Sequence, residues 1–550
     1  MVSLFVTAAW AISLYYFFKV VRLLVRPMFS PLRDLPGPKT SNLILGHLDE
    51  IRKAQNAEVH ERWVEEYGKT LVYKQFFNGD RLYTVDLRAL SHVLTHTAVY
   101  QKPAQARRNL SRLLGNGVLV TEGEKHRQQR KVMNPSFGPS SIRKLTPVFF
   151  RKAIQLRDVW KSELFKDSAP QRIEILSWLS RTTLDVIGLA GFNYKFHALT
   201  VDQEPNELNK AFSTLFHAEG VIRILPFLQA FFPIFRLIPT KRARDEQNAQ
   251  DTMRRIGQTL VNERKRQLLG QDRNDKDGAN GGTLQDDDND ALSGEDLLSA
   301  LMKANMDTDV PEHQRMSDED VLAQVPTFFV AGHETTSTEV MWCLHSLSYI
   351  PETQAKLRDE LLTVTTDTPE MAELDALPYL DAVVRETLRL HAAVPSTIRE
   401  AVVDDVIPLS EPFKDRKGQL RYEIPVTKGE TILFPILAVN RSKALWGEDV
   451  LEFRPERWFN LPEAANSIPG VWGSLLTFLG GSRSCIGYRF ALIEMKALLF
   501  TLIRAFEFTA VYPKSEFETR SLVVQRPYLR SNKKGPAQMP LNIKPYVKTT

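Results

Sequence analysis

The chain has few of the features that define several large protein classes. Only two cysteines occur, Cys343 and Cys485, which excludes a disulfide scaffold and any site built from four cysteines. An excess of one charge is also lacking, because 71 basic and 66 acidic side chains leave a net charge of +5. Residues 1–40 hold five basic side chains and one acid. The remaining chain is therefore almost neutral, which argues against a nucleic-acid-binding surface.

Long uncharged runs are also scarce, and the clearest one lies at the N-terminus. Residues 2–18 carry no charge, and about 20 apolar residues span a bilayer. Basic residues follow this run and no small-residue cleavage site comes after it, which favours an anchor over a cleaved signal peptide. We predict a transmembrane signal anchor over residues 1–26, with the rest of the chain in the cytosol. Residues 27–40, rich in proline, are expected to form a stiff spacer.

Residues 41–550 are predicted to form one large, mostly helical domain. Alternating apolar positions over 70–85 indicate a β-hairpin, and long helical patterns dominate from about residue 87 to 505. Residues 221–239 are strongly apolar, but their prolines and arginines argue against a second span. This leaves a buried helix pair or a surface that dips into a membrane. Residues 270–296 are rich in acids and glycine, as in a flexible surface insertion.

Cys485 is the strongest candidate for chemistry. It ends a glycine-rich segment, and a helical pattern begins at Tyr488. Because a helix N-terminus favours an anion, the pKa of this thiol should be lowered and the thiolate form favoured. Glycines 480, 481 and 487 allow the backbone to approach a flat ligand, and a thiolate suits haem iron as an axial ligand. Cys343 lies among apolar residues and is expected to be a buried structural cysteine.

The segment Phe478–Gly487 resembles the haem-binding signature of the cytochrome P-450 monooxygenases: Phe, two residues, Gly, one, Arg, one, Cys, one, Gly. Three further motifs occur in the family order, so the resemblance covers roughly residues 35–545 and is closest to fungal microsomal members. It implies the cytochrome P-450 fold, mainly α with small β-sheets, preceded here by one transmembrane helix. It also implies haem b, with Cys485 as the iron ligand and Phe478, Gly481, Arg483 and Gly487 as further cofactor-binding residues.

A second motif is Ala331-Gly332-His333-Glu334-Thr335-Thr336, in a helical pattern from about 318 to 349 with Ser317 as its N-cap. The Thr335 hydroxyl can bond the Ala331 carbonyl, which bends a helix, and Gly332 would leave the resulting groove open. The resemblance identifies Glu334 and Thr335 as the acid–alcohol pair that delivers protons during oxygen activation. Pro326 departs from the family pattern and is expected to kink the helix one turn earlier.

The remaining motifs concern the protein core and the two haem propionates. By resemblance, Glu386 and Arg389 form a structural cluster with Arg457, which precedes Trp458 where the family has Phe. The charged side chains of Glu386 and Arg389 lie on one helix face because the two residues are three positions apart. The expected propionate ligands are Arg483, Arg399, and the pair His126 and Arg130, with His126 standing where the family has Trp.

The substrate pocket and the redox partner are placed by resemblance. The pocket residues are Phe328, Phe329, Ala331, Val394 and Thr397, with core packing as the alternative for each. Their apolar character favours a hydrophobic small molecule: a terpenoid, sterol, fatty acid or polycyclic aromatic, in secondary metabolism or detoxification. Electrons are expected from a membrane-bound NADPH–cytochrome P-450 reductase, with cytochrome b5 as a second donor. The expected reductase surface comprises Arg127, Lys131, Arg489 and Lys496.

The expected location is the endoplasmic reticulum membrane, with a single pass and a cytosolic catalytic domain. Two other functions stay open on the sequence. A haem-thiolate isomerase or peroxide-using enzyme would need no reductase, and a non-catalytic haem sensor or electron carrier would need no oxygen chemistry. The Glu334–Thr335 pair argues against both, because neither function requires a proton relay.

Overall fold

The computed structural model describes residues 28–40, 42–164, 170–200, 207–216, 241–268, 296–306, 311–521, 523–532 and 535–548, with a few residues between 10 and 25. Most of the predicted anchor, the whole apolar segment 221–239 and almost all of the insertion 270–296 lie outside the described residues. Within the described part, none of the helices combines the length and the apolar character that a membrane crossing requires.

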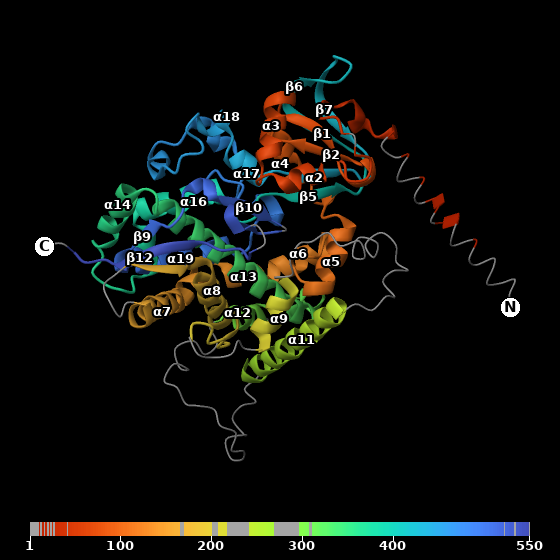
Figure 1. Cartoon of the computed structure of the whole chain (residues 1–550). Helices are drawn as coiled ribbons and strands as arrows, with labels where there is room; N and C mark the ends of the chain where they lie inside the picture. Colours follow the sequence, from red (N-terminus) through yellow and green to blue (C-terminus); the bar gives the residue numbers. More distant parts are fainter. Residues whose placement is uncertain are drawn as a thin grey trace. The chain divides into compact units, whose positions relative to one another are not determined.

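The described chain forms two compact units, each assembled from three segments. Unit 1 comprises Met1–Ala104, Leu388–Cys485 and Phe517–Arg530, and unit 2 comprises Gln105–Thr387, Ile486–Glu516 and Ser531–Thr550. Many elements of both units are labelled in Figure 1. The mainly helical character with small sheets agrees with the predicted fold class.

Unit 1 is built around a five-stranded sheet in the order β1-β2-β8-β5-β3. The predicted hairpin is confirmed: β1 (Thr70–Lys74) pairs antiparallel with β2 (Asp80–Thr84), and β2 pairs parallel with β8 (Thr431–Phe434). Helix α3 packs Val59 and Trp63 onto this sheet. The other elements of unit 1 are η1 (Pro31–Asp34), α2 (Leu48–Lys53), α3 (Glu58–Tyr67), η2 (Phe76–Asn78), α4 (Leu87–Thr95), β3 (Tyr100–Gln101), β5 (Thr397–Ala401), β6 (Asp405–Lys414), β7 (Leu420–Val426), α17 (Ile436–Asn440), α18 (Lys443–Trp446), η8 (Pro455–Phe459), η9 (Glu463–Ser467), η10 (Gly481–Arg483), β10 (Phe517–Ser521) and β11 (Gln525–Leu529).

The expectation of helical patterns from about 87 to 505 is wrong over residues 397–434. That stretch forms β5, β6, β7 and β8, of which β6 and β7 make a separate two-stranded sheet. Buried side chains alternate with less buried ones only at residues 407–409 of β6 and 424–426 of β7, and the rest of both strands is mostly exposed. Such alternation marks a half-buried strand.

Unit 2 is mostly helical. The long helix α13 (Asp318–Leu347) packs against α8 (Ile175–Phe192), α11 (Lys241–Leu268) and α19 (Tyr488–Ala505), and α19 packs against α7 (Pro139–Leu164). The remaining helices are α5 (Ala104–Leu114), α6 (Gly123–Met133), η3 (Asn134–Phe137), α9 (Glu207–Phe216), α12 (Leu297–Met306), η7 (Glu312–Gln314), α14 (Pro351–Leu361), α15 (Met371–Asp375), α16 (Pro378–His391, which continues into unit 1), η11 (Lys514–Glu516) and η12 (Arg530–Asn532). A three-stranded sheet has the order β4-β12-β9, with β4 (Gln171–Glu174), β12 (Pro540–Pro545) and β9 (Phe506–Ala510).

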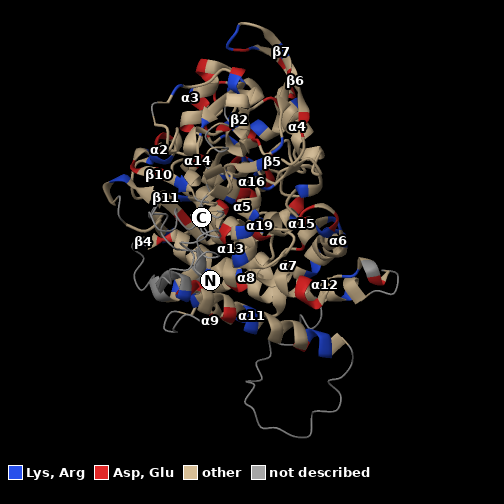
Figure 2. Ribbon diagram, turned by 90° about the vertical axis from the view of Figure 1, so that its right-hand side faces the viewer, with Lys and Arg blue, Asp and Glu red and all other residues tan. Residues whose placement is uncertain are grey.

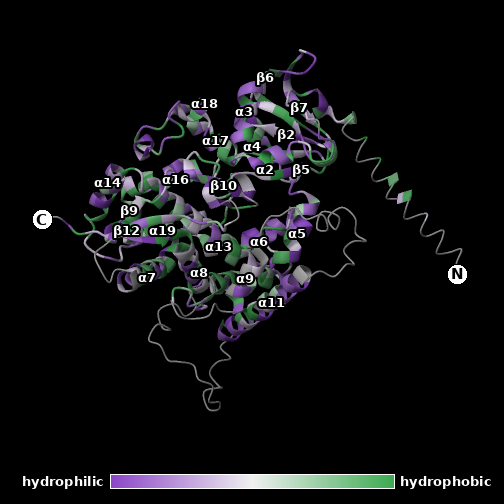
Figure 3. Ribbon diagram, in the orientation of Figure 1, coloured by the Kyte–Doolittle hydropathy of each residue, from purple (hydrophilic) through white to green (hydrophobic). Residues whose placement is uncertain are grey.

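Surface composition follows this packing. Purple, hydrophilic residues predominate along α11 in Figure 3, whereas more than half of the residues of α13 are buried. In Figure 2 the blue Lys and Arg positions and the red Asp and Glu positions are interspersed along the ribbon. An amphipathic outer helix covering an apolar inner one is the usual arrangement in a layered helical domain.

The start of α13 agrees with the sequence prediction. The Ser317 hydroxyl accepts a hydrogen bond from the Asp320 amide, and the Asp320 carboxylate accepts one from the Ser317 amide. This reciprocal capping box satisfies two amides that have no partner within a helix. The helix continues through Pro326 to Leu347 without interruption, so the expected kink does not break it.

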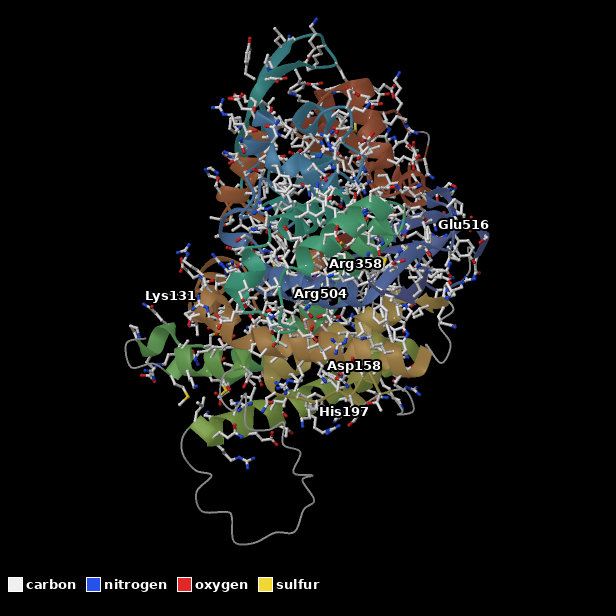
Figure 4. The ribbon with its side chains drawn as sticks, turned by 90° about the vertical axis from the view of Figure 1, so that its left-hand side faces the viewer. Lys131, Asp158, His197, Arg358, Arg504 and Glu516 are labelled. Atoms are coloured by element: carbon white, nitrogen blue, oxygen red, sulfur yellow. The ribbon has the colours of Figure 1, made fainter. Side chains whose placement is uncertain are left out.

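Arg358 on α14 connects three elements of unit 2. Its side chain is only 5% exposed. The guanidinium donates to the carbonyls of Ile503, at 2.8 Å, and Phe506, at 2.9 Å, and to the side-chain oxygen of Gln354. Its carbon Cζ lies 4.4 Å from the ring centre of Tyr546. Arg358 therefore holds α14 against the end of α19 and the start of β9; it is labelled in Figure 4.

Replacing Arg358 with Met should destabilise the protein by about 3 kcal/mol, because two buried carbonyls lose charged hydrogen-bond donors. The measurement is the free energy of unfolding from urea denaturation of the full-length, haem-loaded protein. Lys356→Met is the control, since Lys356 is an exposed residue of the same helix. Its ammonium lies 4.3 Å from the centre of the Tyr379 ring, so its effect should stay within about 1 kcal/mol. Equal losses in the two variants would contradict a structural role for Arg358.

Candidate functional site

In unit 1 the chain before α19 forms a tight turn that presents Cys485. The Cys485 amide donates to the Phe478 carbonyl at 2.8 Å, which closes the turn. Phe478 and Ser484 are buried, whereas Cys485 is exposed. The turn therefore buries its own flanks and leaves the cysteine accessible to a ligand.

Two positions in this turn need glycine, because backbone carbonyls occupy the space that the side chain of a larger residue would fill. A Cβ on Gly480 would lie 1.9 Å from the Pro469 oxygen, and one on Gly481 would lie 2.7 Å from the Leu94 oxygen. Gly481 also has a φ of +66°, a conformation that is costly for other residues. These contacts lie within unit 1, so Gly480 and Gly481 are required by the packing of the protein itself.

Gly487 differs from these two. A Cβ there would meet Phe137 only at 3.7 Å, which is ordinary contact. Its place is at the N-cap of α19, directly before Tyr488. Its role beside the haem stays a prediction. The position of Cys485 just before a helix N-terminus agrees with the sequence analysis.

The second cysteine has a different environment. Cys343 lies within α13 and is completely buried. Burial raises the pKa of its thiol to about 12, so the neutral thiol persists at physiological pH. This confirms the expectation of a structural cysteine and leaves Cys485 as the accessible thiol of the chain.

In unit 2 the Ala331–Thr336 motif has the predicted hydrogen bond. The Thr335 hydroxyl donates to the Ala331 carbonyl at 2.6 Å. Ala331 is exposed and Glu334 and Thr335 are partly exposed, although most residues on this helix are buried. The motif therefore combines a hydroxyl, a carboxylate and open space on one segment of α13.

The role of Gly332 differs from the expectation. A Cβ on Gly332 would lie 3.0 Å from the side chain of Ile187 on α8. The missing side chain therefore serves the close approach of α8 to α13. The two helices are also joined by Thr183 of α8, whose hydroxyl donates to the His333 carbonyl at 2.9 Å.

Pro326 lies where α13 packs against its neighbouring helices. It lines a narrow seam with residues of α9 and α11, among them Leu208, Met253 and Gly257. A Cβ on Gly257 would approach the Leu322 side chain to 2.9 Å. Here Pro326 contributes to helix packing, and a side chain at Gly257 would require the end of the Leu322 side chain to shift.

The predicted propionate ligands lie in both units. In unit 1, Arg399 on β5 is buried and donates to the Thr397 hydroxyl at 3.1 Å, while Arg483 is half-buried in η10. In unit 2, His126 is buried on α6, and Arg130, one turn later, donates to the Asn134 side chain at 3.0 Å. The contact of these four residues with haem remains a prediction.

Arg389 and Arg457 are buried and bond to the backbone of one segment of unit 1; their predicted cluster with Glu386 stays a prediction. Both are at most 2% exposed. Arg389 donates to the carbonyls of Asn440 and, at 2.7 Å, Val450. Arg457 donates to the Trp446 carbonyl and binds the Asp449 carboxylate at 2.9 Å, which lowers the pKa of Asp449. Together they hold the segment 440–450 of unit 1. Glu386, the third predicted member, is fully buried on α16.

Two of the predicted substrate residues belong to the core of unit 2. Phe329 is completely buried, with ring centres 4.3 Å from Phe192 and 5.3 Å from Phe196. Phe328 is buried against Phe137 and Phe192. Both therefore fit the packing alternative. Ala331 is exposed, and Val394 and Thr397 are partly exposed, so these three remain candidates for the pocket.

The sequence analysis missed Gln324, which fixes the loop after α5. Its side-chain oxygen accepts from the Val118 amide at 2.9 Å. Gly117 approaches so closely that a Cβ would lie 2.6 Å from the Ala323 oxygen. No local pattern signals this contact, because it joins residues about 200 positions apart. The loop after α5 is thereby held against α13.

Of the basic residues predicted to dock the reductase, Lys496 was assigned wrongly. Its side chain is 4% exposed and pairs with Asp375, at 2.8 Å, and Asp381, at 3.0 Å. It therefore joins α19 to α15 and α16 inside unit 2. Arg127 is exposed and pairs with Glu124. Lys131, labelled in Figure 4, bonds Gln314, and Arg489 lies over the Tyr488 ring.

Substituting Gly481 with Ala should lower the free energy of unfolding by about 3 kcal/mol or more, through backbone strain and the clash with the Leu94 carbonyl. Gly418→Ala is the matched control. Gly418 has a φ of +79° but no atom within 4 Å of a Cβ, so only strain of about 1 kcal/mol applies. Urea denaturation of both variants is the measurement. A Gly481→Ala loss no larger than that of Gly418→Ala would show that the carbonyl contact is not constraining.

Known proteins match the chain along almost its whole length. A model of the Cytochrome P450 family matches residues 36–531. Cytochrome P450 monooxygenase 205 of Postia placenta is 52% identical over 540 residues, which covers 98% of this chain and 97% of that protein. Cytochrome P450 monooxygenase 128 of the same fungus is 48% identical over 542 residues, covering 98% and 96%. Cytochrome P450 monooxygenase claP of Ampulloclitocybe clavipes is 34% identical over 554 residues, covering 99% and 97%. With the exposed Cys485 in its glycine turn and the Glu334–Thr335 pair, these matches show that the chain belongs to the cytochrome P450 family of haem-dependent monooxygenases.

Proposed function

We propose that this cytochrome P450 monooxygenase inserts one oxygen atom of O₂ into a hydrophobic small molecule, with electrons from an NADPH–cytochrome P-450 reductase. The observation that carries the proposal is Cys485, an exposed thiol at the end of a turn whose flanks are buried. A cysteine that served only packing would be buried, as Cys343 is. Cys485 is therefore assigned as the iron ligand.

The donor set fits haem b. The iron requires one accessible thiolate, which Cys485 supplies. The two propionate carboxylates require cations, for which Arg399, Arg483, His126 and Arg130 are the proposed donors. When bound, the haem supplies the oxygen-activating chemistry, which a thiolate ligand favours.

Thr335 and Glu334 are the proposed proton-delivery residues. The Thr335 hydroxyl donates to the Ala331 carbonyl, and its oxygen can at the same time accept a proton donor such as water. Rotation of the hydroxyl away from Ala331 would present its proton to the open space beside α13. The partly exposed Glu334 carboxyl is adjacent in the chain and can resupply that proton.

The proposed substrate is apolar. Ala331 and Val394 offer hydrocarbon surface, and Thr397 offers one hydroxyl. A terpenoid, sterol, fatty acid or polycyclic aromatic fits such a lining better than an anion. An isomerase or peroxide-using enzyme would not use the Thr335–Ala331 arrangement. A haem sensor or electron carrier would not use it either.

Membrane attachment is a further part of the proposal and rests on the sequence of residues 1–26. An N-terminal anchor in the endoplasmic reticulum would place the catalytic units beside a membrane-bound reductase and cytochrome b5. It would also give access to substrates that partition into lipid. Of the expected reductase-docking residues, Arg127, Lys131 and Arg489 are retained and Lys496 is not.

Cys485→Ser should abolish the red-shifted carbon monoxide difference spectrum that a thiolate-bound haem gives, because the axial sulfur is lost. Cys343→Ser is the control, since it removes the buried sulfur from α13, and it should keep that spectrum. Both spectra are recorded on full-length protein expressed with haem supply. A thiolate-type spectrum from Cys485→Ser would refute the proposed ligand.

Thr335→Ala should leave the carbon monoxide spectrum and substrate binding unchanged while product formation falls by about 10²-fold or more. NADPH consumption should continue, with electrons released as hydrogen peroxide. The measurement is the ratio of product to NADPH consumed, with peroxide quantified. Thr182→Ala is the control, because Thr182 on α8 makes the same type of bond to the Trp178 carbonyl at 2.8 Å. Normal coupling in Thr335→Ala would contradict the proton-delivery role.

A further inference from the structure

Glu494 is a buried acid of unit 2 that the proposed haem and oxygen chemistry does not use. It lies on α19, is only 1% exposed, and has both carboxyl oxygens inaccessible to water. Its neighbours one helical turn away on α19 are the apolar residues Phe490, Ala491, Ala497 and Leu498. An acid in such surroundings needs a cation or several hydrogen-bond donors if it is to stay ionised.

Neither kind of compensation is found among the residues that the structure describes. Neither oxygen of Glu494 accepts a hydrogen bond from them. The ammonium of Lys496, two positions later, pairs with Asp375 and Asp381 instead. The guanidinium of Arg358 on α14 is engaged by backbone carbonyls. Because an ionised carboxylate can only accept hydrogen bonds, the charged form of Glu494 would stand here without compensation.

The carboxyl of Glu494 is therefore expected to be neutral. Burial raises its pKa well above the ordinary value, and the hydroxyl of Thr336 on α13 opposes that rise. No charged group from the described part of the chain contributes, although titratable groups do lie on the elements packed against α19: Lys152 on α7, His333 and Glu339 on α13, Arg358 on α14, Asp375 on α15 and Glu507 on β9. Glu494 then keeps its proton at physiological pH.

Thr336 provides the acceptor that a neutral carboxyl needs. It is 2% exposed, follows Thr335 directly, and lies on α13, which packs against α19; both helices are labelled in Figure 1. Its hydroxyl is the polar group that acts on Glu494. A hydroxyl oxygen can accept a hydrogen bond while its proton is donated elsewhere. A protonated Glu494 can therefore donate to Thr336, which an ionised Glu494 cannot do.

We propose that Glu494 is a neutral positioning residue, which donates a hydrogen bond to the Thr336 hydroxyl and so ties α19, the helix after Cys485, to the oxygen-side segment of α13. This role rests on the function proposed for Thr335. The Thr335 hydroxyl is held by the Ala331 carbonyl at 2.6 Å, and a restrained Thr336 fixes the same helical turn from the side of α19. A neutral donor does so without the cost of an unpaired buried charge.

The protonation state is tested by infrared difference spectroscopy of the full-length, haem-loaded enzyme at neutral pH. The wild type minus Glu494→Gln should show the C=O stretch of a protonated carboxylic acid, with the shift that exchange into heavy water causes. Glu448→Gln is the control, since the Glu448 side chain is 88% exposed, and its difference spectrum should show an ionised carboxylate. A carboxylate signal from Glu494 in place of the acid signal would overturn the proposal.

The same proton makes the stability of the enzyme depend on pH. Above the ordinary pKa of 4.5 the unfolded chain releases a proton that the folded chain keeps, so stability is lost as pH rises toward the folded pKa. Each pH unit should change the folding equilibrium about tenfold more in the wild type than in Glu494→Gln. The urea midpoint of Glu494→Gln should therefore rise relative to that of the wild type between about pH 5 and pH 8. Parallel pH dependence of the two proteins would contradict a buried proton on Glu494, whatever constant offset the substitution adds.

The positioning role is tested by the ratio of product to NADPH consumed. Glu494→Gln keeps a donor for Thr336 and should retain the ratio, whereas Glu494→Met removes the donor and should lower it several-fold. Thr336→Val should give the same loss, and the double variant Glu494→Met with Thr336→Val no further loss, because both residues act through one bond. Normal ratios in these variants beside a loss in Thr335→Ala would overturn the role of Glu494. Normal coupling in Thr335→Ala would instead overturn the proposed function and leave the infrared result standing.

Discussion

The accessible thiol depends on close contact between backbone segments in unit 1. The carbonyl oxygens of Pro469 and Leu94 occupy the space that side chains at Gly480 and Gly481 would need. The amide of Cys485 then reaches the Phe478 carbonyl. Because these contacts involve backbone on both sides, they cannot relax by side-chain rotation. The direction in which the cysteine points is therefore determined by packing that involves no ligand.

A comparable constraint acts on α13 in unit 2. The Thr335 hydroxyl bonds the Ala331 carbonyl, and the Thr183 and Ser337 hydroxyls both donate to the His333 carbonyl. Such bonds draw on carbonyls that normally serve the helix itself, and they bend or loosen it locally. Close packing of Ile187 against Gly332 holds the segment in this state. The oxygen-side motif thus depends on α8 as much as on its own sequence.

Local signals predicted the features that local chemistry determines. The N-cap at Ser317, the hairpin before Thr84, the Thr335–Ala331 bond and the helix after Cys485 all depend on residues close together in the chain. The strands over 397–434 were missed for two reasons. Strands β5 and β8 pair with each other and with segments distant in the chain, and β6 and β7, although a local hairpin, show little alternation of buried and exposed side chains. Neighbouring residues also could not predict the burial of Lys496 or the packing role of Gly332, since each depends on a partner more than 100 residues away in the chain.

The contrast between the two cysteines also makes the protein convenient to follow by chemical labelling. Cys485 is exposed, while Cys343 is buried and its pKa is raised to about 12, so a maleimide or disulfide reagent should modify the native chain once and the denatured chain twice. Haem insertion would cover the reactive sulfur. Counting labelled thiols on the native enzyme then reports the apoprotein fraction of a preparation without any optical signal from the cofactor.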